Sequence, residues 1–176
     1  MTKEGFDPIA GRNPRVLILG TFPSEESLRQ NRYYAHPRNL FWDMIAAICG
    51  TGKHEEYEKR CESARRAGIA IWDVLKSCDR EGSSDVRIRR GHFIPNDIEG
   101  FLSAHPVTAI FFNGTKAAQL FKQHVDLSIL PAQPRLVTLP STSPAHAALS
   151  RQQKLERWLE VKPCLAVSNQ HAAPVR

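Results

Sequence analysis

The chain has 176 residues, of which 41% are apolar and 24% are charged, and these proportions exclude a disordered or collagen-like protein. Its length suits one domain with a substantial core. The net charge of +6 favours a polyanionic partner only modestly, because many basic proteins bind no nucleic acid.

Cysteine and histidine spacing bears on metal sites and on the cellular compartment. The four cysteines form no C-x-x-C pair, and the histidines lack the spacing of metal ligands, so we expect reduced thiols and no metal. No apolar segment follows the first methionine, and no run reaches membrane-spanning length. The sequence therefore predicts a cytoplasmic protein that does not contact membranes.

The first expected element is a buried strand at residues 16–19. Its four consecutive apolar residues, VLIL, suit a strand that is buried on both faces of a parallel sheet. Gly20 ends the run, and a polar turn of residues 21–24 follows. The sequence thus places a polar turn at the carboxyl end of a central strand.

The next expected element is a helix that begins at Pro37 and ends before Gly50. Proline fits the first helical turn, where a missing N–H costs nothing, and glycine fits the residue just past the end. Asn39 would lie in the first turn, where free N–H groups and the helix dipole favour an electron-rich partner.

The rest of the chain alternates between helix and strand patterns. Flexible segments are expected at residues 1–14, where Phe6 and Ile9 could pack on the core, and at residues 162–176. Residues 76–91 form a basic loop whose arginines could contact phosphates or simply face solvent. Further strands are expected at residues 69–75, 107–112 and 136–139, with helices at residues 55–66 and 96–102, after residue 115 and from residue 150.

This alternation predicts one domain, residues 1–176, with an α/β fold: a three-layer αβα sandwich around a four-stranded parallel sheet. Ligands bind such sheets beyond the carboxyl ends of the strands. Three strand ends carry polar segments, at residues 20–24, 113–116 and 140–146. We expect these segments to meet at one edge, beside Asn39, and to form a pocket.

Motif content narrows the chemistry of this pocket. The sequence has no G-x-x-x-x-G-K-[ST] loop, G-x-G-x-x-G turn or G-x-S-x-G elbow, which weakens nucleotide-binding and serine hydrolase interpretations. Aromatic rings near amide and hydroxyl groups suit an extruded nucleobase, which needs stacking and hydrogen bonds to its edge. The candidate rings are Phe22, Tyr33, Tyr34, Phe41 and Trp42, of which Trp42 better suits the core.

Three motifs, GTFPSEESL…YYAHPRNLFW, IFFNGTKA and LPSTSPAH, together resemble those of the uracil-DNA glycosylase superfamily. They are most similar to the hypoxanthine-DNA (deoxyinosine) glycosylase branch. The resemblance implies a DNA glycosylase of base excision repair that flips out a deaminated base and hydrolyses its N-glycosidic bond without a cofactor. Hypoxanthine is the first expected base and uracil the alternative. The expected partner is DNA containing deaminated bases, bound by a monomer.

The resemblance also assigns expected roles to individual residues. Asn39 resembles the residue that positions the attacking water, Phe41 the stacking aromatic, and Asn113 the base-reading asparagine. Phe22 is expected beside the base, with nearby backbone N–H groups acting as donors to the leaving anion. The loop after the last strand resembles one that enters the minor groove, and it contains Ser141, Ser143, Pro144 and His146.

Two positions depart from the family pattern. Phe22 stands where many members carry an acidic residue or asparagine, so water activation would rest on Asn39. Leu139 stands where many carry a histidine, so an imidazole contact to the departing base would need His146. Because Asn39 is a poor base, it can only orient water, which suffices if the glycosidic bond breaks largely before attack.

Several alternatives stay open on sequence alone. Glu25 and Glu26 better suit the start of a short helix that includes Ser27 and Leu28, and Asp43 an exposed position. Glu25 is kept as the alternative base. Lys116 is expected at a helix start facing phosphate, which favours a monofunctional enzyme over a Schiff-base lyase. A non-catalytic module for damaged or single-stranded nucleic acid, or a small-molecule nucleoside hydrolase, would use the same pocket.

Overall fold

A computed structural model describes residues 2–52, 54–79, 82 and 92–166. Its centre is a parallel four-stranded sheet of order β3-β2-β6-β7, which confirms the predicted fold class. The two inner strands and β3 are almost wholly apolar and are buried on both faces, as the sequence predicted for a parallel sheet. The strands are β2 (Val16–Gly20), β3 (Ile69–Asp73), β6 (Ala109–Asn113) and β7 (Arg135–Leu139).

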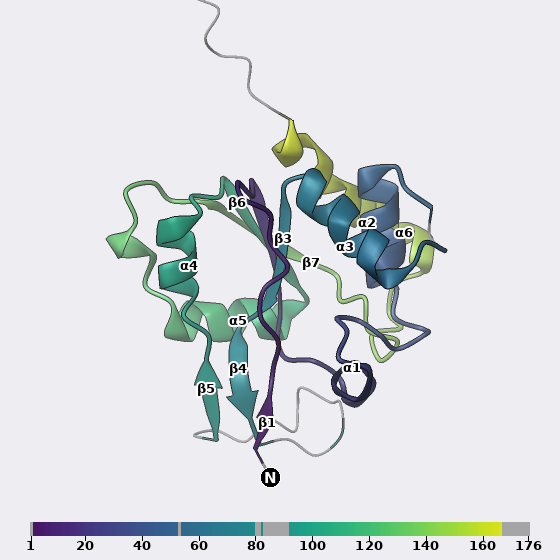
Figure 1. Ribbon diagram of the computed structural model, residues 1–176, viewed down its shortest axis with the longest axis horizontal. Coiled ribbons are helices and arrows are strands. Elements are labelled where there is room, and N and C mark those ends of the chain that lie inside the picture. The colour runs from purple at the N-terminus through teal and green to yellow at the C-terminus, as the bar shows by residue number, and fades with distance from the viewer. Residues whose placement is uncertain (1, 53, 80–81, 83–91, 167–176) are drawn as a thin grey trace, which may run out of the picture.

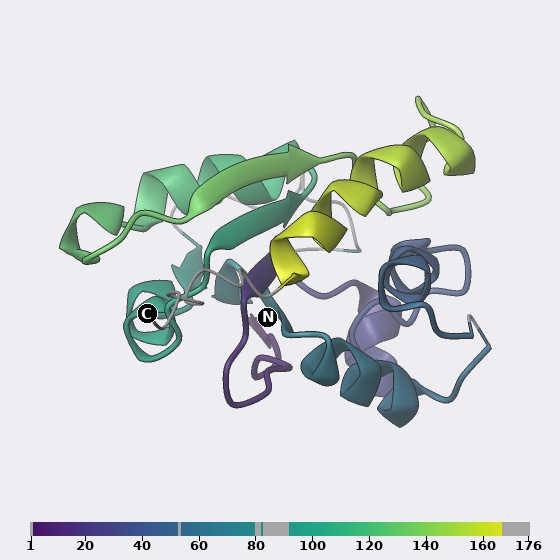
Figure 2. The ribbon, with the colours of Figure 1, turned by 90° about the horizontal axis from the view of Figure 1, so that it is seen from above.

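Helices cover both faces of this sheet (Figures 1 and 2). One face carries α2 (Phe41–Cys49), α3 (Tyr57–Arg66) and α6 (Arg151–Trp158). The other face carries α4 (Ile98–Ala104) and α5 (Thr115–His124). A short helix, α1 (Glu25–Gln30), follows β2 at the carboxyl edge of the sheet, so this edge is where the connecting segments gather.

A second, antiparallel sheet extends from the carboxyl end of β3 and was not predicted. Its order is β1-β4-β5, with β1 (Lys3–Glu4), β4 (Leu75–Cys78) and β5 (Phe93–Pro95). The lead-in of residues 1–14, expected to be flexible, therefore contributes a strand. Ile9 also forms an isolated bridge with Ile71 through two backbone hydrogen bonds, and its side chain is buried in the core, as the sequence allowed.

The C-terminal end also differs from the expectation. A 3-10 helix, η3 (Leu159–Leu165), continues α6, and its Val161 is fully buried. The first residues of the expected flexible tail, 162–165, thus belong to a helix, while residues 167–176 lie outside the described part. So do the arginines of the predicted basic loop, at positions 80, 87, 89 and 90. No helix within the described residues has the length and apolar character that a membrane span needs.

Candidate active site

A cavity of about 100 Å³ lies at the carboxyl edge of the parallel sheet. We call it the strand-end cavity. It brings together the turn after β2, the segment before α2, the ends of β3 and β6, and the loop after β7. Its walls are residues 20–24, Ser27, Tyr33, Tyr34, Asn39, Asp73, Asn113 and residues 141–143. The three polar strand ends that the sequence predicted to converge therefore share one wall.

Gly20 sits at the floor of this cavity for a steric reason. A Cβ atom built on it would meet both Asp73 Oδ1 and Tyr34 OH, each within 2.7 Å. Any larger residue would have to displace these two polar groups, which converge from different segments of the chain. Beyond Gly20, Ser24 caps α1 by accepting a hydrogen bond from Ser27 N at 3.2 Å.

Asn39 lies on the cavity wall but precedes its helix. The structure begins α2 at Phe41 rather than at Pro37, with Leu40 as the N-cap residue. Asn39 Oδ1 accepts a hydrogen bond from Phe41 N at 3.0 Å, a local bond between side chain and backbone just before the helix. This bond fixes the carboxamide plane. Oδ1 retains a second lone pair, and the structure gives Nδ2 no acceptor among the described residues.

Asn113 is tied to the loop after β7 through Thr142, which is completely buried. Its Nδ2 donates to Thr142 Oγ1, and its Oδ1 accepts from Thr142 N, both at 2.9 Å. Leu40 N donates to Thr142 O at 3.1 Å. Thr142 thus links the end of β6 to the residue after Asn39, and one N–H of the Asn113 carboxamide remains for a ligand.

The aromatic wall differs from the prediction in one respect. Phe41 is fully buried and does not line the cavity. The ring of Tyr34 stacks on it with centroids 3.7 Å apart and planes at 16°, and Tyr34 itself lines the cavity. The helix start at Phe41 turns that ring into the core, where it also meets Trp42 and Trp158 edge-on. The cavity-facing rings are those of Tyr34, Tyr33 and Phe22.

The predicted DNA-contacting loop is held in shape by its own serines. Ser143 N donates to Ser141 Oγ and Ala145 N to Ser143 Oγ, both at 3.2 Å. Helix α6 anchors both ends of the loop, since Trp158 Nε1 donates to Pro140 O at 2.9 Å and Lys154 Nζ to His146 O at 2.6 Å. Burial lowers the pKa of Lys154.

The predicted loop residues occupy different places relative to the cavity. Ser141 and Ser143 line it, Pro144 is exposed, and His146 is half-buried outside the cavity wall.

The rival carboxylates lie outside the strand-end cavity. Glu25 is exposed and pairs with Lys3. Hydrogen bonds from Arg29 and Gln30 lower the pKa of Glu26 to about 2, so this carboxylate is a very weak base. Asp43 pairs with Arg151 at 3.2 Å. Helix α1 does begin at Glu25, as the sequence predicted.

The carboxylate that does line the cavity, Asp73, was missed by sequence reasoning. It is the last residue of β3 and is buried. Burial raises the pKa of Tyr33, and the Asp73 charge raises it further. The signal in the sequence was an acid that ends an otherwise apolar strand at the ligand-binding edge. Thr21 is also buried on the wall, and its Oγ1 has no hydrogen-bond partner within the described residues.

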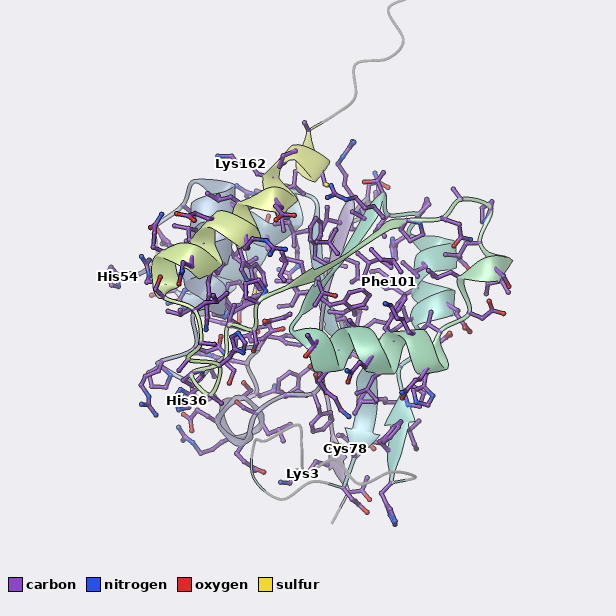
Figure 3. The ribbon with its side chains drawn as sticks, turned by 180° about the vertical axis from the view of Figure 1, so that it is seen from behind. Lys3, His36, His54, Cys78, Phe101 and Lys162 are labelled. Atoms are coloured by element: carbon purple, nitrogen blue, oxygen red, sulfur yellow. The ribbon has the colours of Figure 1, made fainter. Side chains whose placement is uncertain are left out.

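A larger hollow of about 860 Å³, which we call the adjoining groove, shares Tyr33, Tyr34 and Asn39 with the cavity. Figure 3 labels His36, one of its lining residues, at the end of the molecule that carries β1 and β4, opposite Lys162. Charged residues of both signs line the groove: Arg32, Arg60, Asp43, Glu55, Glu56 and Glu58.

No cluster of three potential metal ligands occurs among the described residues. The site is therefore an aromatic and carboxamide cavity at the carboxyl edge of an α/β sheet, with a serine-rich loop beside it. These features define a protein of the base-flipping class, in which a nucleobase is held by stacking and edge contacts.

Comparison with known proteins identifies the family. The Uracil DNA glycosylase superfamily model matches residues 8–162, so the chain belongs to the uracil DNA glycosylase superfamily and is a DNA glycosylase. Two similar proteins are each named hypoxanthine DNA glycosylase. The one from Methanosarcina barkeri is 34% identical over 120 residues, and the one from Methanosarcina acetivorans is 38% identical over 121 residues. Each match covers 68% of this chain and 75% of the relative.

A solved structure has the same fold. It is the solution NMR structure of a candidate uracil DNA glycosylase from Methanosarcina acetivorans, with a TM-score of 0.78 and 32% sequence identity. The match covers 94% of this chain and 99% of that one. The fold and the enzyme class inferred from the three motifs are thereby confirmed.

Proposed function

We propose that this DNA glycosylase excises hypoxanthine, and uracil as a second substrate, from DNA as the first step of base excision repair. The names of the two Methanosarcina relatives support hypoxanthine as the first base. The observation that carries the proposal is the meeting of Asn39, Asn113 and the Tyr34 ring on one small cavity. Both bases present a lactam N–H beside a carbonyl, so the same carboxamide can contact either.

In the proposed complex the flipped base stacks on Tyr34 rather than on Phe41. Tyr34 lines the cavity, and one face of its ring rests on Phe41, which gives a rigid platform. Phe22 bounds the base from another wall. The free N–H of Asn113 and the hydroxyl of Thr21 are available to the base edge.

The chemical step follows from the kind of groups that face the cavity. The glycosidic bond breaks with its electron pair going to the base, which leaves as a delocalised anion, and the sugar becomes an oxocarbenium ion. Water held by the Asn39 carboxamide adds to the sugar carbon, and its proton ends on the released base. Donors of the turn at residues 20–24 and of Asn113 stabilise the anion, and losing one such donor costs roughly 3 kcal/mol of transition-state stabilisation.

The same geometry supports monofunctional action. Lys116 stands in the first turn of α5 and is not among the described residues that line the cavity. The buried Lys154 is engaged with the backbone of His146. Water is therefore the nucleophile, and the expected product is an abasic site in an unbroken strand.

The test is a panel of DNA duplexes that each hold one deoxyinosine, deoxyuridine, deoxyxanthosine or ethenodeoxycytidine. Each is incubated with the protein and then cleaved with alkali, with an Asn39→Ala variant in parallel. We expect cleavage of the inosine strand first and the uridine strand second, and none without alkali. Tight binding without release of base would contradict the proposal, as would strand breaks that need no alkali.

A further inference from the structure

Asp73 is a buried carboxylate in the wall of the strand-end cavity, a position where a charged group is unusual. Only 4% of its surface is exposed. A buried carboxylate is costly unless other groups hydrogen-bond to it. It also stands near a base that departs as an anion, where an unneutralised negative charge would oppose the reaction.

The geometry of the floor indicates what Asp73 faces. Asp73 pairs in register with Gly20 across β2 and β3. The missing side chain of Gly20 leaves one small space, and both Asp73 Oδ1 and Tyr34 OH lie within 2.7 Å of the point where a Cβ would stand. A carboxylate oxygen and a phenol oxygen thus converge over the same α-carbon.

Tyr34 is already fixed at its backbone and on one ring face. It adopts a left-handed conformation with φ of 54°, which a bulky residue keeps only where its surroundings impose it. The next residue, Ala35, donates its N–H to Ser27 Oγ at 3.2 Å, and the residue before it, Tyr33, donates to Tyr57 OH at 3.0 Å. Phe41 covers one face of the ring. The hydroxyl end of the ring lies over Gly20, where Asp73 Oδ1 also lies.

Asp73 sits on a rigid support. Asn96 Nδ2 donates to Asp73 O at 2.9 Å, and the following residue, Val74, donates its N–H to Gly20 O at 2.9 Å. The corner between β3 and β4 is therefore clamped from both sides, and it can act as a fixed point for another side chain.

We propose that Asp73 is a positioning residue that accepts a hydrogen bond from the Tyr34 hydroxyl and thereby sets the ring against which the flipped base stacks. This rests on the proposed function, in which Tyr34 forms the stacking platform. The phenol proton screens the carboxylate, so the charge is stabilised without facing the departing base. Gly20 is required because only a hydrogen at its α-carbon leaves room for the two oxygens.

A double-mutant cycle tests this coupling. The proteins are wild type, Asp73→Leu, Tyr34→Phe and the double variant, with Asp73→Asn added as the conservative replacement. Single-turnover excision from a deoxyinosine duplex gives a rate constant and a half-saturating concentration. We expect each single variant to raise the half-saturating concentration about tenfold and the double variant to add no further loss. Asp73→Asn, which keeps an acceptor, should stay within about threefold of wild type.

Several results would overturn the proposal. Losses that multiply in the double variant would mean that Asp73 acts without Tyr34. A large loss in Asp73→Asn, together with a vanished acidic limb in the pH–rate profile, would make Asp73 a base or a direct contact to the substrate. Asp43→Leu is the matched control, because that carboxylate lies outside the cavity and pairs with Arg151.

A second readout keeps the proposal separate from the enzymatic activity. Urea unfolding of wild type, the two single variants and the double variant should also show non-additive losses, here in the free energy of unfolding. We expect this because Asp73 and Tyr34 would contact each other in the protein without DNA. If wild type released no base, the proposed function would fail, and the unfolding cycle would still decide whether Asp73 and Tyr34 are coupled. Additive unfolding losses would contradict the contact.

Discussion

The strand-end cavity and the adjoining groove share Tyr33, Tyr34 and Asn39 but differ in size and in lining. The cavity measures about 100 Å³ and the groove about 860 Å³. Carboxamides, hydroxyls, aromatic rings and one buried carboxylate, Asp73, line the cavity. Charges of both signs line the groove. The cavity is therefore the smaller and less charged of the two hollows, while the groove presents several carboxylates and two guanidinium groups to solvent.

The largest expected effect on stability distinguishes the roles of the two stacked rings, Phe41 and Tyr34. Phe41→Ala should lower the free energy of unfolding by about 3–5 kcal/mol, because it empties a fully buried site. Tyr34→Ala should cost less stability but weaken binding of a flipped base, since stacking contributes about 1–3 kcal/mol per base. Thermal unfolding and single-turnover excision distinguish the two. Equal losses of stability, with base binding unaffected by Tyr34→Ala, would contradict the assignment of Tyr34 as the platform.

The next effect concerns the floor of the cavity. Gly20→Ala should cost about 1–3 kcal/mol of stability, because the new methyl group would overlap the space taken by Asp73 and Tyr34. It should also slow excision. Gly52→Ala is the matched control, since a Cβ there meets only Glu55 atoms at 3.6 Å. Urea denaturation measures the stability of both variants, and single-turnover excision measures their rates. A Gly20→Ala variant as stable as wild type would show that the two oxygens can move apart freely.

An effect of similar size on stability is expected from the hydrogen bonds between Asn113 and Thr142. Thr142→Val removes the acceptor for Asn113 Nδ2 and should cost about 1–3 kcal/mol, because it leaves a half-buried donor without its partner. Thr138→Val, on the exposed part of β7, should be nearly neutral. The same denaturation measurements apply. If Thr142→Val kept full stability and excision rate, the loop would not depend on Asn113 for its position.

The smallest effect is expected in the groove. Arg32 lies over the Tyr57 ring, 5.3 Å from its centroid, a contact that contributes about 0.5–1 kcal/mol at an exposed site. Arg32→Gln should therefore change stability slightly and leave the salt dependence of DNA binding as it is. A salt slope reduced by about one would assign a phosphate contact to Arg32 and charge selectivity to the groove.

Sequence reasoning predicted the central sheet because β2, β3 and β6 consist almost wholly of apolar residues, which have few other placements. It missed the antiparallel sheet because β1 has only two residues, Lys3 and Glu4, both polar. Their strand conformation depends on pairing with β4, which lies more than 70 positions away. Contacts of this kind leave no local pattern in the sequence.

For the candidate site, the sequence predicted which segments meet at the cavity but not every side chain that faces it. Asn39, Asn113 and Phe22 reach one cavity because strand ends of a parallel sheet share an edge. Which ring faces that cavity was not predictable, because it depends on the left-handed backbone at Tyr34 and on where α2 begins. Asp73 was overlooked because its neighbours in sequence are core residues, and only the fold places its side chain over Gly20.

The most direct test compares Asn39→Ala with Glu25→Ala in single-turnover excision from inosine and uridine duplexes. Orientation of water by a residue of the strand-end cavity predicts a loss of about 10²–10³-fold for Asn39→Ala. Glu25→Ala, which removes an exposed partner of Lys3, should stay close to wild type. Intact cleavage by Asn39→Ala together with its loss in Glu25→Ala would move the chemistry out of the cavity and contradict the proposed mechanism.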